Sequence, residues 1–461
     1  MEHTTKSTNI NNKSIMKLGY NEIMIVSMYF DDIEDFINLE IGIKRFQGNM
    51  ERFHFNPIPL NDYSRKLFPN IETFHIYNRS DEEFNDGKII KKVMWCTVDY
   101  STYLQEKEEW NECKSIIYTK HEREKYGNTI PPEVTSLGSR CFEGCYSLTS
   151  INIPTTISKI GDDCFRWCSS LQTIKIPSTV SEIGNGCFSG CSTLTSINIE
   201  TMQFISQERI FINEPVLVSF SIPKNLQIIN EENIEKKDIN EFIVPATITK
   251  LGNWCFNSCS SLTSVNIQSS VSELGNGCFY NCTSLKSINI PSTIKEFGYW
   301  CFNKCSSLTS INIPSSVTSI GNTQFDRCSS LRNLEIDNLQ FVSEERIFMN
   351  EPVLVSIKTP DNIEMINGKS VEKRDVNEFI IPTQVNELGK WCFYGCMLLT
   401  SINIPSSISK LGDRCFYECF ALTSINIPSS ITSFGGYCFY NCGCEEELKK
   451  NKAIPRICFN R

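Results

Sequence analysis

The 461-residue chain carries a formal net charge of −9 and has a sequence pI near 5.3, which argues against a general nucleic-acid-binding protein, since such proteins usually present a basic face. Hydrophobic residues make up 40% of the sequence, enough for a continuous core, and no run approaches the roughly 18 apolar residues of a membrane-spanning helix. Residues 1–16 are polar and lack the apolar segment of a secretory signal. We therefore expect a cytoplasmic protein whose 23 cysteines are free thiols.

Composition and repetition divide the sequence into four segments. A tail rich in Thr, Asn, Ser and Lys, expected to be flexible, precedes a helical cap region, a long array of repeats and a charged C-terminal tail. The predicted boundaries are 1–15 for the flexible tail, 16–125 for the cap region, 126–443 for the repeats and 444–461 for the C-terminal tail.

The beginning of the cap region has the spacing of two short helices. Apolar residues recur at helical intervals over residues 21–46, and Asp31 and Asp32 are expected to cap the second helix. Two short helices that close on Lys44-Arg45-Phe46 resemble an F-box, the motif that docks substrate adaptors onto ubiquitin ligases. Leu18-Gly19 stands where that motif usually opens with Leu-Pro.

The rest of the cap region holds traces of a repeat. Ile71, Phe74 and Ile76 are apolar at positions 0, +3 and +5, and Val93, Cys96 and Val98 repeat that spacing. We predict two degenerate repeat turns here, in which Val98 follows Ile76 in one column, and then a charged helix or linker over residues 105–125.

A 23-residue unit then repeats with little variation; one copy begins at Leu262 and the next at Leu285. Two gaps interrupt the clear copies, one after Leu194 and one after Leu331. Four apolar residues divide these gaps into steps of one unit: Leu217, Ile239, Leu354 and Val376. The series predicts about thirteen unbroken turns, with a larger unit duplicated inside it, so that Cys187 corresponds to Gln324 and Cys255 to Cys392.

Each unit has the pattern of a short strand followed by a tight turn. Leucine and two β-branched residues at positions 0, +3 and +5 face a core, while Thr263, Ser264 and Asn266 stay outside. Pro291 ends its strand because it lacks an N–H, Gly298 turns the chain, and Cys-Phe-x-x-Cys follows as a short helical turn. No single turn buries both its faces, so neighbouring turns must stack into a rod.

The string Leu-x-x-Ile-x-Ile-Pro-x-Ser-Val/Ile-x-x-Ile-Gly-x-x-Cys-Phe-x-x-Cys-x-x-Leu, found over residues 130–443, resembles the BspA-type leucine-rich repeat of bacterial and protist surface or interaction proteins. In that family the first cysteine position is more often alanine. The resemblance implies a right-handed leucine-rich-repeat solenoid of the α+β type, with about 13 turns and a small helical N-terminal cap, and a role in protein binding or adhesion. Residues 20–125 are expected to cover one end of the rod and polar residues 445–450 the other.

Nineteen of the 23 cysteines lie in ten copies of Cys-Phe-x-x-Cys, with Gln324 in place of one of them. The spacing leaves zinc binding, disulfide columns and simple packing open. Zinc sites favour Cys-x2-Cys or added histidine, and none of His3, His54, His75 and His121 lies in a repeat. Gln324 in an otherwise intact copy favours packing, so we predict buried free thiols, with no metal and no cofactor.

The outward strand positions carry a column of asparagines beside Thr and Ser. Such a column either stabilises the sheet as a stacked polar ladder or offers an uncharged, hydrogen-bonding surface to a protein or glycan. The candidate partner-binding residues are Asn152, Asn198, Asn266, Asn289, Asn312, Asn403 and Asn426.

The gaps also carry duplicated charged segments, 208–209 with 344–346 and 235–238 with 372–375. Two interpretations stay open: solvated loops, or a two-point contact for a partner.

No nucleophile with a neighbouring base and no phosphate-binding loop is apparent, so we predict a non-enzymatic protein. Cys458, fourth from the end and preceded by several basic residues, resembles a prenylation box and is the only route to a membrane that the sequence offers. The favoured function is an interaction or adhesion scaffold. The alternatives are a ubiquitin-ligase adaptor that docks through residues 18–46, and a metal-loaded or redox cysteine array.

Overall fold

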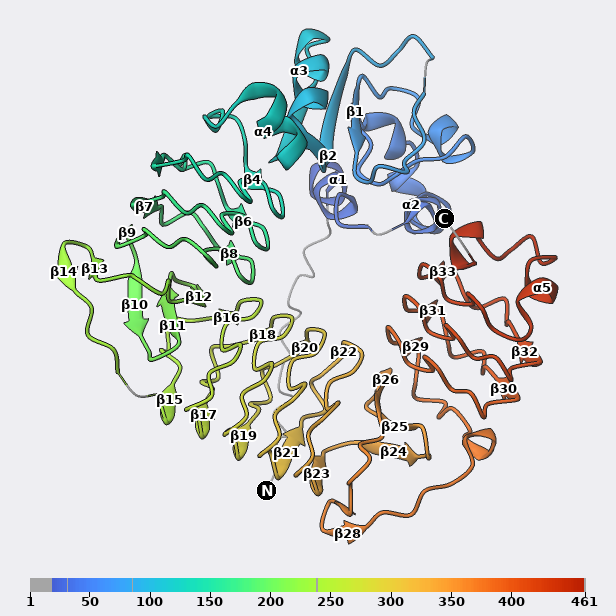
Figure 1. The fold of residues 1–461 in the computed structure, drawn as a ribbon. Helices are drawn as coiled ribbons and strands as arrows, with labels where there is room; N and C mark the ends of the chain where they lie inside the picture. Colours follow the sequence, from blue (N-terminus) through green and yellow to red (C-terminus); the bar gives the residue numbers. More distant parts are fainter. Residues whose placement is uncertain (1–18, 31, 85, 238, 460–461) are drawn as a thin grey trace, which may run out of the picture. The chain divides into compact units, whose positions relative to one another are not determined.

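Figure 1 shows the computed structural model, which describes residues 19–30, 32–84, 86–237 and 239–459. The predicted flexible tail lies outside these ranges. The chain forms two compact units, Met1–Ile117 and Tyr118–Arg461. The first mixes short helices with a small parallel sheet, whereas the second is built almost entirely from short strands.

Two helices open the first unit, as predicted: α1 (Tyr20–Ser27) and α2 (Ile33–Gly42). Asp32 caps α2, because its carboxylate accepts two backbone N–H groups of the first turn at 2.9 and 3.1 Å; Asp31 lies outside the described residues. Phe36 is fully buried and meets two further phenylalanine rings edge-on at 5.3 and 5.8 Å. Three 3-10 turns follow: η1 (Lys44–Phe46), η2 (Met50–Arg52) and η3 (Ser64–Leu67).

The two degenerate turns do stack as parallel strands, but not in the predicted register. The elements are β1 (Thr73–Ile76), β2 (Lys91–Asp99), α3 (Tyr100–Glu108) and β3 (Glu112–Tyr118). Ile76 pairs with Met94 instead of Val98. The predicted spacing is wrong because β2 buries two neighbouring residues, Val93 and Met94, which breaks the alternation that the spacing assumes.

The expected helix or linker over residues 105–125 is only partly right, because a strand interrupts it. The segment holds the end of α3, strand β3 and helix α4 (Lys120–Tyr126). Ile116 and Tyr118 of β3 are buried while Ile117 between them is half-buried, the alternation of a strand with one face in a core. The surrounding Glu and Lys residues hide this short apolar signal in the sequence.

The second unit is a β-solenoid with two ladders of short parallel strands, which lie along opposite edges of the stacked turns (Figure 1). The first ladder contains β5 (Ser150–Ile151), β7 (Thr173–Ile176), β9 (Ser196–Ile199), β13 (Ile228–Ile229), β15 (Glu241–Ile243), β17 (Ser264–Asn266), β19 (Ser287–Asn289), β21 (Ser310–Ile313), β23 (Asn333–Ile336), β27 (Met365–Ile366), β30 (Ser401–Asn403) and β32 (Ser424–Asn426). The second ladder contains β4 (Ser136–Leu137), β6 (Lys159–Ile160), β8 (Glu182–Ile183), β12 (Val216–Ser221), β16 (Lys250–Leu251), β18 (Glu273–Leu274), β20 (Glu296–Phe297), β22 (Ser319–Ile320), β26 (Val353–Lys358), β29 (Glu387–Leu388), β31 (Lys410–Leu411) and β33 (Ser433–Phe434).

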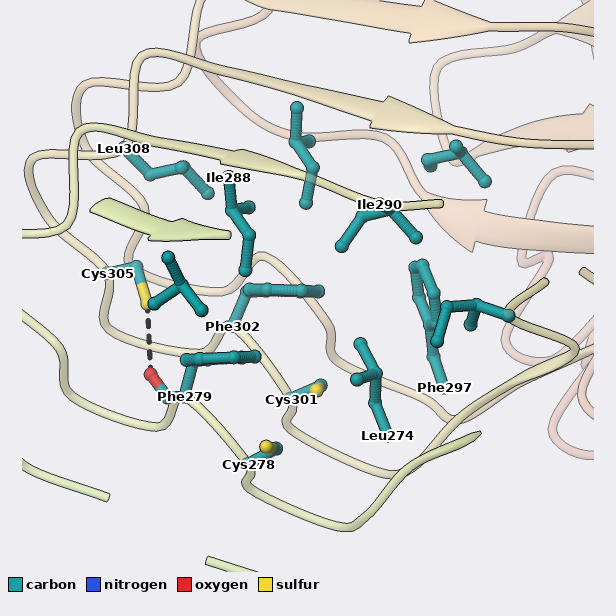
Figure 2. Packing of buried hydrophobic residues seen from close by; sticks show 14 of the residues in the cluster. Leu274, Cys278, Phe279, Ile288, Ile290, Phe297, Cys301, Phe302, Cys305 and Leu308 are labelled. Atoms are coloured by element: carbon teal, nitrogen blue, oxygen red, sulfur yellow. Dashed lines mark hydrogen bonds between the residues drawn. The ribbon is translucent and has the colours of Figure 1, made fainter. Parts of the chain in front are cut away.

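Stacking in register creates the core between the ladders. Val265 pairs with Ile288 and Leu274 with Phe297, so each apolar position forms a column one repeat apart. The phenylalanines of Cys-Phe-x-x-Cys stack face to face; the rings of Phe279 and Phe302 lie 5.6 Å apart at 4° (Figure 2). The predicted repeat solenoid is confirmed, with about 15 turns in place of about 13.

The Cys-Phe-x-x-Cys segment is not the short helical turn that its spacing predicts. Residues before and inside each copy adopt left-handed backbone conformations, such as Trp254 at φ 59° and Ser258 at φ 59°. This alternation points N–H groups at the next turn: Trp254 N–H donates to Asn276 O at 2.7 Å and Phe256 N–H to Cys278 O at 2.7 Å. The segment therefore forms a third set of hydrogen bonds between turns, which compensates the cost of about 1–2 kcal/mol for each left-handed side chain.

Gly298 serves a different purpose from the predicted one. Its φ is not left-handed; instead a Cβ at this position would lie 2.4 Å from the backbone nitrogen of Asn276 in the preceding turn. Glycine is needed because neighbouring turns approach so closely here, where Gly298 N–H donates to Leu274 O at 2.8 Å.

The two gaps do not hold evenly spaced turns, so part of the predicted series is wrong. Leu217 pairs with Leu251 of the second ladder. The first-ladder position belongs to Leu226, since Ile228 shortly after it pairs with Ser196. In the second gap Leu354 likewise lies in the second ladder, whereas Ile239 and Val376 are buried in their predicted columns.

An antiparallel hairpin inserted into each enlarged turn causes this difference. β10 (Met202–Ile205) and β11 (Arg209–Ile212) fold onto β12, and β24 (Leu339–Val342) and β25 (Arg346–Met349) fold onto β26. The short strands β14 (Glu232–Asn233) and β28 (Lys369–Ser370) and the 3-10 turn η4 (Val376–Glu378) complete the two insertions. The duplicated sequence therefore builds a duplicated structure.

The C-terminal end of the solenoid is closed mainly by apolar residues. Helix α5 (Glu445–Leu448) buries Leu448, and Ile454 and Phe459 are buried beyond it. The turn η5 (Arg456–Cys458) continues the backbone ladder, since Tyr437 N–H donates to Ile457 O at 2.7 Å. Polar residues 445–450 contribute a cover, but the expected closure by them alone is wrong.

Candidate partner-binding surface

The asparagine column lies on the outward side of the first ladder, which we call the strand face. Alternation places Val265 and Ile288 inside and the neighbouring amides outside, and Asn266 pairs directly with Asn289 in the register. Six of the seven predicted residues are exposed: Asn152, Asn198, Asn266, Asn289, Asn403 and Asn426. The seventh, Asn312, is half-buried.

A shallow groove of about 420 Å³ crosses this face over β17, β19 and β21. Its lining residues are serines, asparagines and the strand residues between them, with Glu335 at one end. The groove brings together Asn266, Asn289 and Asn312 from three consecutive turns. The four other predicted asparagines lie on the same face outside it.

Two asparagines of the column form hydrogen bonds to the protein's own backbone. Asn312 accepts the N–H of Ile290 at 2.8 Å and donates to its carbonyl at 2.7 Å, and Asn426 makes the same pair of bonds to Ile404 at 2.6 and 2.9 Å. These two amides stabilise the ladder and are not free for a partner. For them the stacked-ladder interpretation holds.

Asn230 and Asn367 make the same bidentate contact in the enlarged turns, and the sequence reasoning missed both. Asn230 bonds the N–H and carbonyl of Ile199 at 2.7 and 2.9 Å, and Asn367 bonds those of Ile336 at 2.7 and 2.9 Å. They occupy equivalent positions in the two duplicated halves, so alignment of these halves contains the signal.

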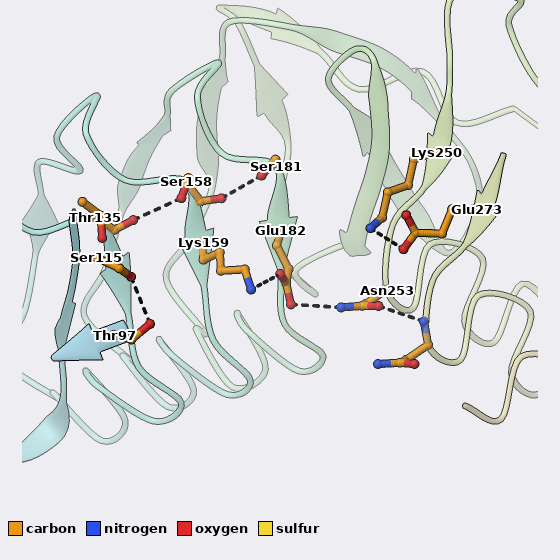
Figure 3. Close-up of polar contacts among 11 residues, drawn as sticks. Thr97, Ser115, Thr135, Ser158, Lys159, Ser181, Glu182, Lys250, Asn253 and Glu273 are labelled. Atoms are coloured by element: carbon orange, nitrogen blue, oxygen red, sulfur yellow. Dashed lines mark hydrogen bonds and ion pairs between the residues drawn. The ribbon is translucent and has the colours of Figure 1, made fainter. Parts of the chain in front are cut away.

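The Ser and Thr hydroxyls beside these ladders mostly bond to the preceding turn. Thr263 donates to Asn240 O at 2.6 Å, and Ser158 and Ser181 form successive bonds to Thr135 O and Ser158 O at 3.3 and 3.2 Å (Figure 3). Hydroxyls in such columns are part of the inter-turn bonding and offer little to a ligand.

The second ladder carries a polar groove of about 480 Å³ whose charges are largely paired with each other. Lys159 and Glu182 lie 2.8 Å apart, Lys250 and Glu273 2.5 Å apart, and Asn253 donates to Glu182 at 2.9 Å (Figure 3). Partly exposed ion pairs of this kind contribute up to about 1 kcal/mol each and hold their side chains in place. This groove is therefore less available for hydrogen bonding than the strand face.

The repeat cysteines are buried, as predicted, and their thiols are free in this structure. The second thiol of a copy donates to the phenylalanine carbonyl of the preceding turn, as between Cys305 and Phe279 O at 3.1 Å (Figure 2). Burial raises the pKa of Cys191 to about 11 and that of Cys282 well above its ordinary value, so these thiols stay protonated and unreactive at neutral pH. Within the described ranges, no group of three or more His, Cys, Asp or Glu residues is placed to hold a metal ion.

The duplicated charged segments are not simply solvated loops. Arg209 is 2% and Arg346 is 3% exposed. The Arg346 guanidinium donates to Ser356 Oγ at 2.6 Å, to Ser356 O at 3.3 Å and to Tyr394 O at 3.0 Å, and Arg209 makes equivalent bonds to Ser219. Both arginines anchor a hairpin to the solenoid, so the surface interpretation is wrong for these two residues.

The remaining candidates do not assemble a reactive centre. Of the histidines, His3 lies outside the described residues and His75 stacks on Phe55 at 4.8 Å, where burial lowers its pKa. Cys458 is fully buried in the end of the solenoid, which opposes its modification by a lipid. No helix among the described residues is both long and apolar enough to cross a membrane.

Comparison with protein families identifies the repeat. The chain matches the model for the BspA type leucine rich repeat region in six copies, over residues 127–237, 227–351 and 342–460. The chain belongs to the BspA-type leucine-rich-repeat family. Members of this family are repeat proteins whose usual role is protein interaction or a surface scaffold, and the cysteine-rich solenoid described above is this chain's version of that fold.

Solved structures of leucine-rich-repeat proteins match the chain at low identity and low TM-score. A leucine-rich repeat protein from Bacteroides ovatus is 22% identical, with 72% of this chain and 90% of that chain covered and a TM-score of 0.27. A leucine rich cell surface protein from Faecalibacterium prausnitzii is 20% identical, with 78% and 80% covered and a TM-score of 0.32, and the pneumococcal vaccine antigen PcpA is 16% identical, with 69% and 72% covered and a TM-score of 0.35. No curated protein matches the chain.

Proposed function

We propose that this BspA-type protein is a non-enzymatic scaffold that holds a protein partner along its strand face. The observation that carries the proposal is the row of free side-chain amides. Asn266 and Asn289 are exposed, lie directly opposite each other and make no side-chain hydrogen bond to any described residue. Each amide offers two donors and one acceptor to a partner.

The chemistry of the groove favours an extended polypeptide. Peptide N–H and C=O groups match neutral amides that both donate and accept, whereas a charged ligand finds only Glu335 at the end of the groove. Several weak contacts in consecutive turns add up along a partner that follows the ladder. A glycan presents hydroxyls to the same amides and is the alternative ligand.

The proposal is tested by converting the two free amides to carboxylates. Asn266→Asp with Asn289→Asp keeps the side-chain shape and both exposed positions, but replaces donors with negative charge, so we expect the fold to persist and partner affinity to fall at least about tenfold. Ser269→Asp with Ser292→Asp is the matched control, because these exposed serines lie in the same two turns, beyond the strands, and make no side-chain hydrogen bond to a described residue.

Affinity capture from native extract, followed by titration with the purified partner, measures the effect. Equal binding by both double variants contradicts the proposal. Binding that is lost after enzymatic deglycosylation of the partner assigns the surface to a glycan instead.

A ubiquitin-ligase adaptor is the second candidate, and one observation favours it. The helix pair α1–α2 leaves large apolar side chains in solvent: Ile25 and Tyr29 are 58% and 82% exposed, and Ile41 is 77% exposed. An adaptor needs such an apolar docking face. Ile25→Asp with Ile41→Asp then abolishes capture of ligase scaffold components; unchanged capture, or none by the wild-type chain, removes this candidate.

We propose the cytoplasm as the site of action. The support is the array of buried free thiols, which suits a reducing compartment. Display at a cell surface is the alternative that family membership suggests.

A further inference from the structure

The last Cys-Phe-x-x-Cys copy departs from the hydrogen-bonding pattern of the others. In six of the seven copies that directly follow another copy, the second thiol donates to the phenylalanine carbonyl of the preceding turn at 3.0–3.1 Å. The six donors are Cys168, Cys191, Cys282, Cys305, Cys328 and Cys419. Cys442 occupies the same position and does not make this bond; its sulfur instead lies 3.7 Å from that of Cys444.

The backbone holds this pair of thiols together. Gly443 between them donates its N–H to Cys419 O at 3.1 Å, and a Cβ on Gly443 would lie 2.4 Å from Phe420 O. Only glycine fits against the preceding turn at this point. Cysteines two residues apart have Cα atoms within about 7 Å of each other, inside the range that a disulfide spans.

From this geometry we propose that Cys442 and Cys444 form a redox-active dithiol, which a small-molecule disulfide such as oxidised glutathione converts to an intramolecular disulfide. This redox activity is separate from the proposed binding function and does not depend on it. It is also distinct from the six second thiols above, each of which donates to a carbonyl of the preceding turn.

The contact between the two sulfurs makes the two thiols differ in reactivity. The hydrogen bond from Cys442 lowers the pKa of Cys444, while the same bond, with burial, raises the pKa of Cys442. Cys444 is therefore the attacking thiolate and Cys442 the resolving thiol. Both residues are only 6% exposed and share a buried cluster with Leu448, Ile454 and Phe459, so the exchange follows local opening of the residues that close this end of the solenoid.

The thiol–disulfide exchange takes place in two steps. The Cys444 thiolate attacks one sulfur of oxidised glutathione, so the glutathione disulfide breaks, a mixed disulfide forms on Cys444 and one glutathione thiolate leaves. Cys442 then loses its proton and attacks the Cys444 sulfur, and the second glutathione thiolate leaves. The two cysteines lose two electrons and glutathione disulfide gains them, with two molecules of reduced glutathione released.

The test uses the full-length protein with oxidised glutathione at neutral pH, followed by differential alkylation that is read at each cysteine by tandem mass spectrometry. We expect Cys442 and Cys444 to become protected together in a peptide lighter by two hydrogen atoms, to be released by dithiothreitol, and to leave Cys282 and Cys419 reduced. A glutathione adduct that persists on Cys444 without a disulfide, or oxidation of the pair no faster than of Cys282, overturns the proposal.

Variants test the division of roles. Without oxidant, Cys444 is expected to react with iodoacetamide at least about tenfold faster than Cys419, because a larger fraction of Cys444 is thiolate. Cys442→Ala removes the donor and slows Cys444 towards the rate of Cys419, Cys442→Ser restores part of the rate through its hydroxyl, and Cys419→Ala changes nothing. Equal Cys444 rates in all of these proteins contradict the assigned roles, and the disulfide mapping on the wild-type chain stands independently of how well the variants fold.

Discussion

At the scale of single residues, the solenoid is limited by how closely its turns approach each other. Gly298 and its counterparts occupy positions where even a methyl group meets the backbone of the turn before. The sequence shows these glycines but suggests a turn conformation, because spacing alone cannot distinguish a left-handed φ from a close approach. Glycine is required at these positions because a larger side chain would clash with the preceding turn.

Gly298→Ala is expected to destabilise the protein by about 1–3 kcal/mol, since overpacking forces the backbone of two turns apart. Gly436→Ala is the matched control, because the nearest atom to its added Cβ lies 3.7 Å away and its φ is not left-handed. Urea unfolding followed by circular dichroism measures both. A loss of stability at Gly436 as large as that at Gly298 would contradict the steric account.

Gln324 and the cysteine that it replaces are expected to differ in their contribution to stability. Cys278→Ala removes a buried sulfur and costs on the order of 1 kcal/mol. Gln324→Ala should cost more, because the amide donates to Gly298 O at 2.6 Å and to Gly321 O at 2.8 Å, and accepts from Cys301 N–H at 3.2 Å. Thermal denaturation compares the two variants; a larger loss for Cys278→Ala would show that the thiol does more than fill space.

At the scale of elements, strands whose apolar residues repeat in register were predictable, and the inserted hairpins were not. Leu262, Leu285 and Leu308 align at a constant interval, so their columns follow from the sequence. Leu217 and Leu354 also fit the interval, yet both lie in the second ladder, because an antiparallel hairpin adds residues that a one-dimensional period does not register. A residue that matches the repeat interval can therefore lie in a different ladder from the one predicted.

Leu285→Asp should unfold the solenoid locally, because Leu285 is fully buried and an unpaired carboxylate in the core costs several kcal/mol. Hydrogen exchange read by mass spectrometry is expected to show faster exchange in β17, β19 and β21, with little change in β30 and β32 at the far end. Wild-type exchange in β19 of this variant would contradict the assigned core column.

At the scale of the whole molecule, the sequence predicts the architecture better than the site. The family resemblance and the solenoid follow from a long run of nearly identical turns, whereas the availability of each asparagine depends on which neighbour its amide reaches. Asn289 and Asn312 have the same local sequence, Ser-Ile-Asn-Ile-Pro, yet only the second bonds back to the preceding turn. The sequence of a single repeat does not contain this difference, because the bond is made to another turn.

Site-specific photo-cross-linking tests the central claim, a partner held along the strand face, most directly. A benzoylphenylalanine at Asn289 is compared with one at Glu296, which lies in the second ladder of the same solenoid. We predict that a partner present in native extract cross-links from position 289, and that the yield falls when unmodified protein competes. Cross-links to that partner from position 296 but not from 289 would contradict the account and move the binding surface to the second ladder.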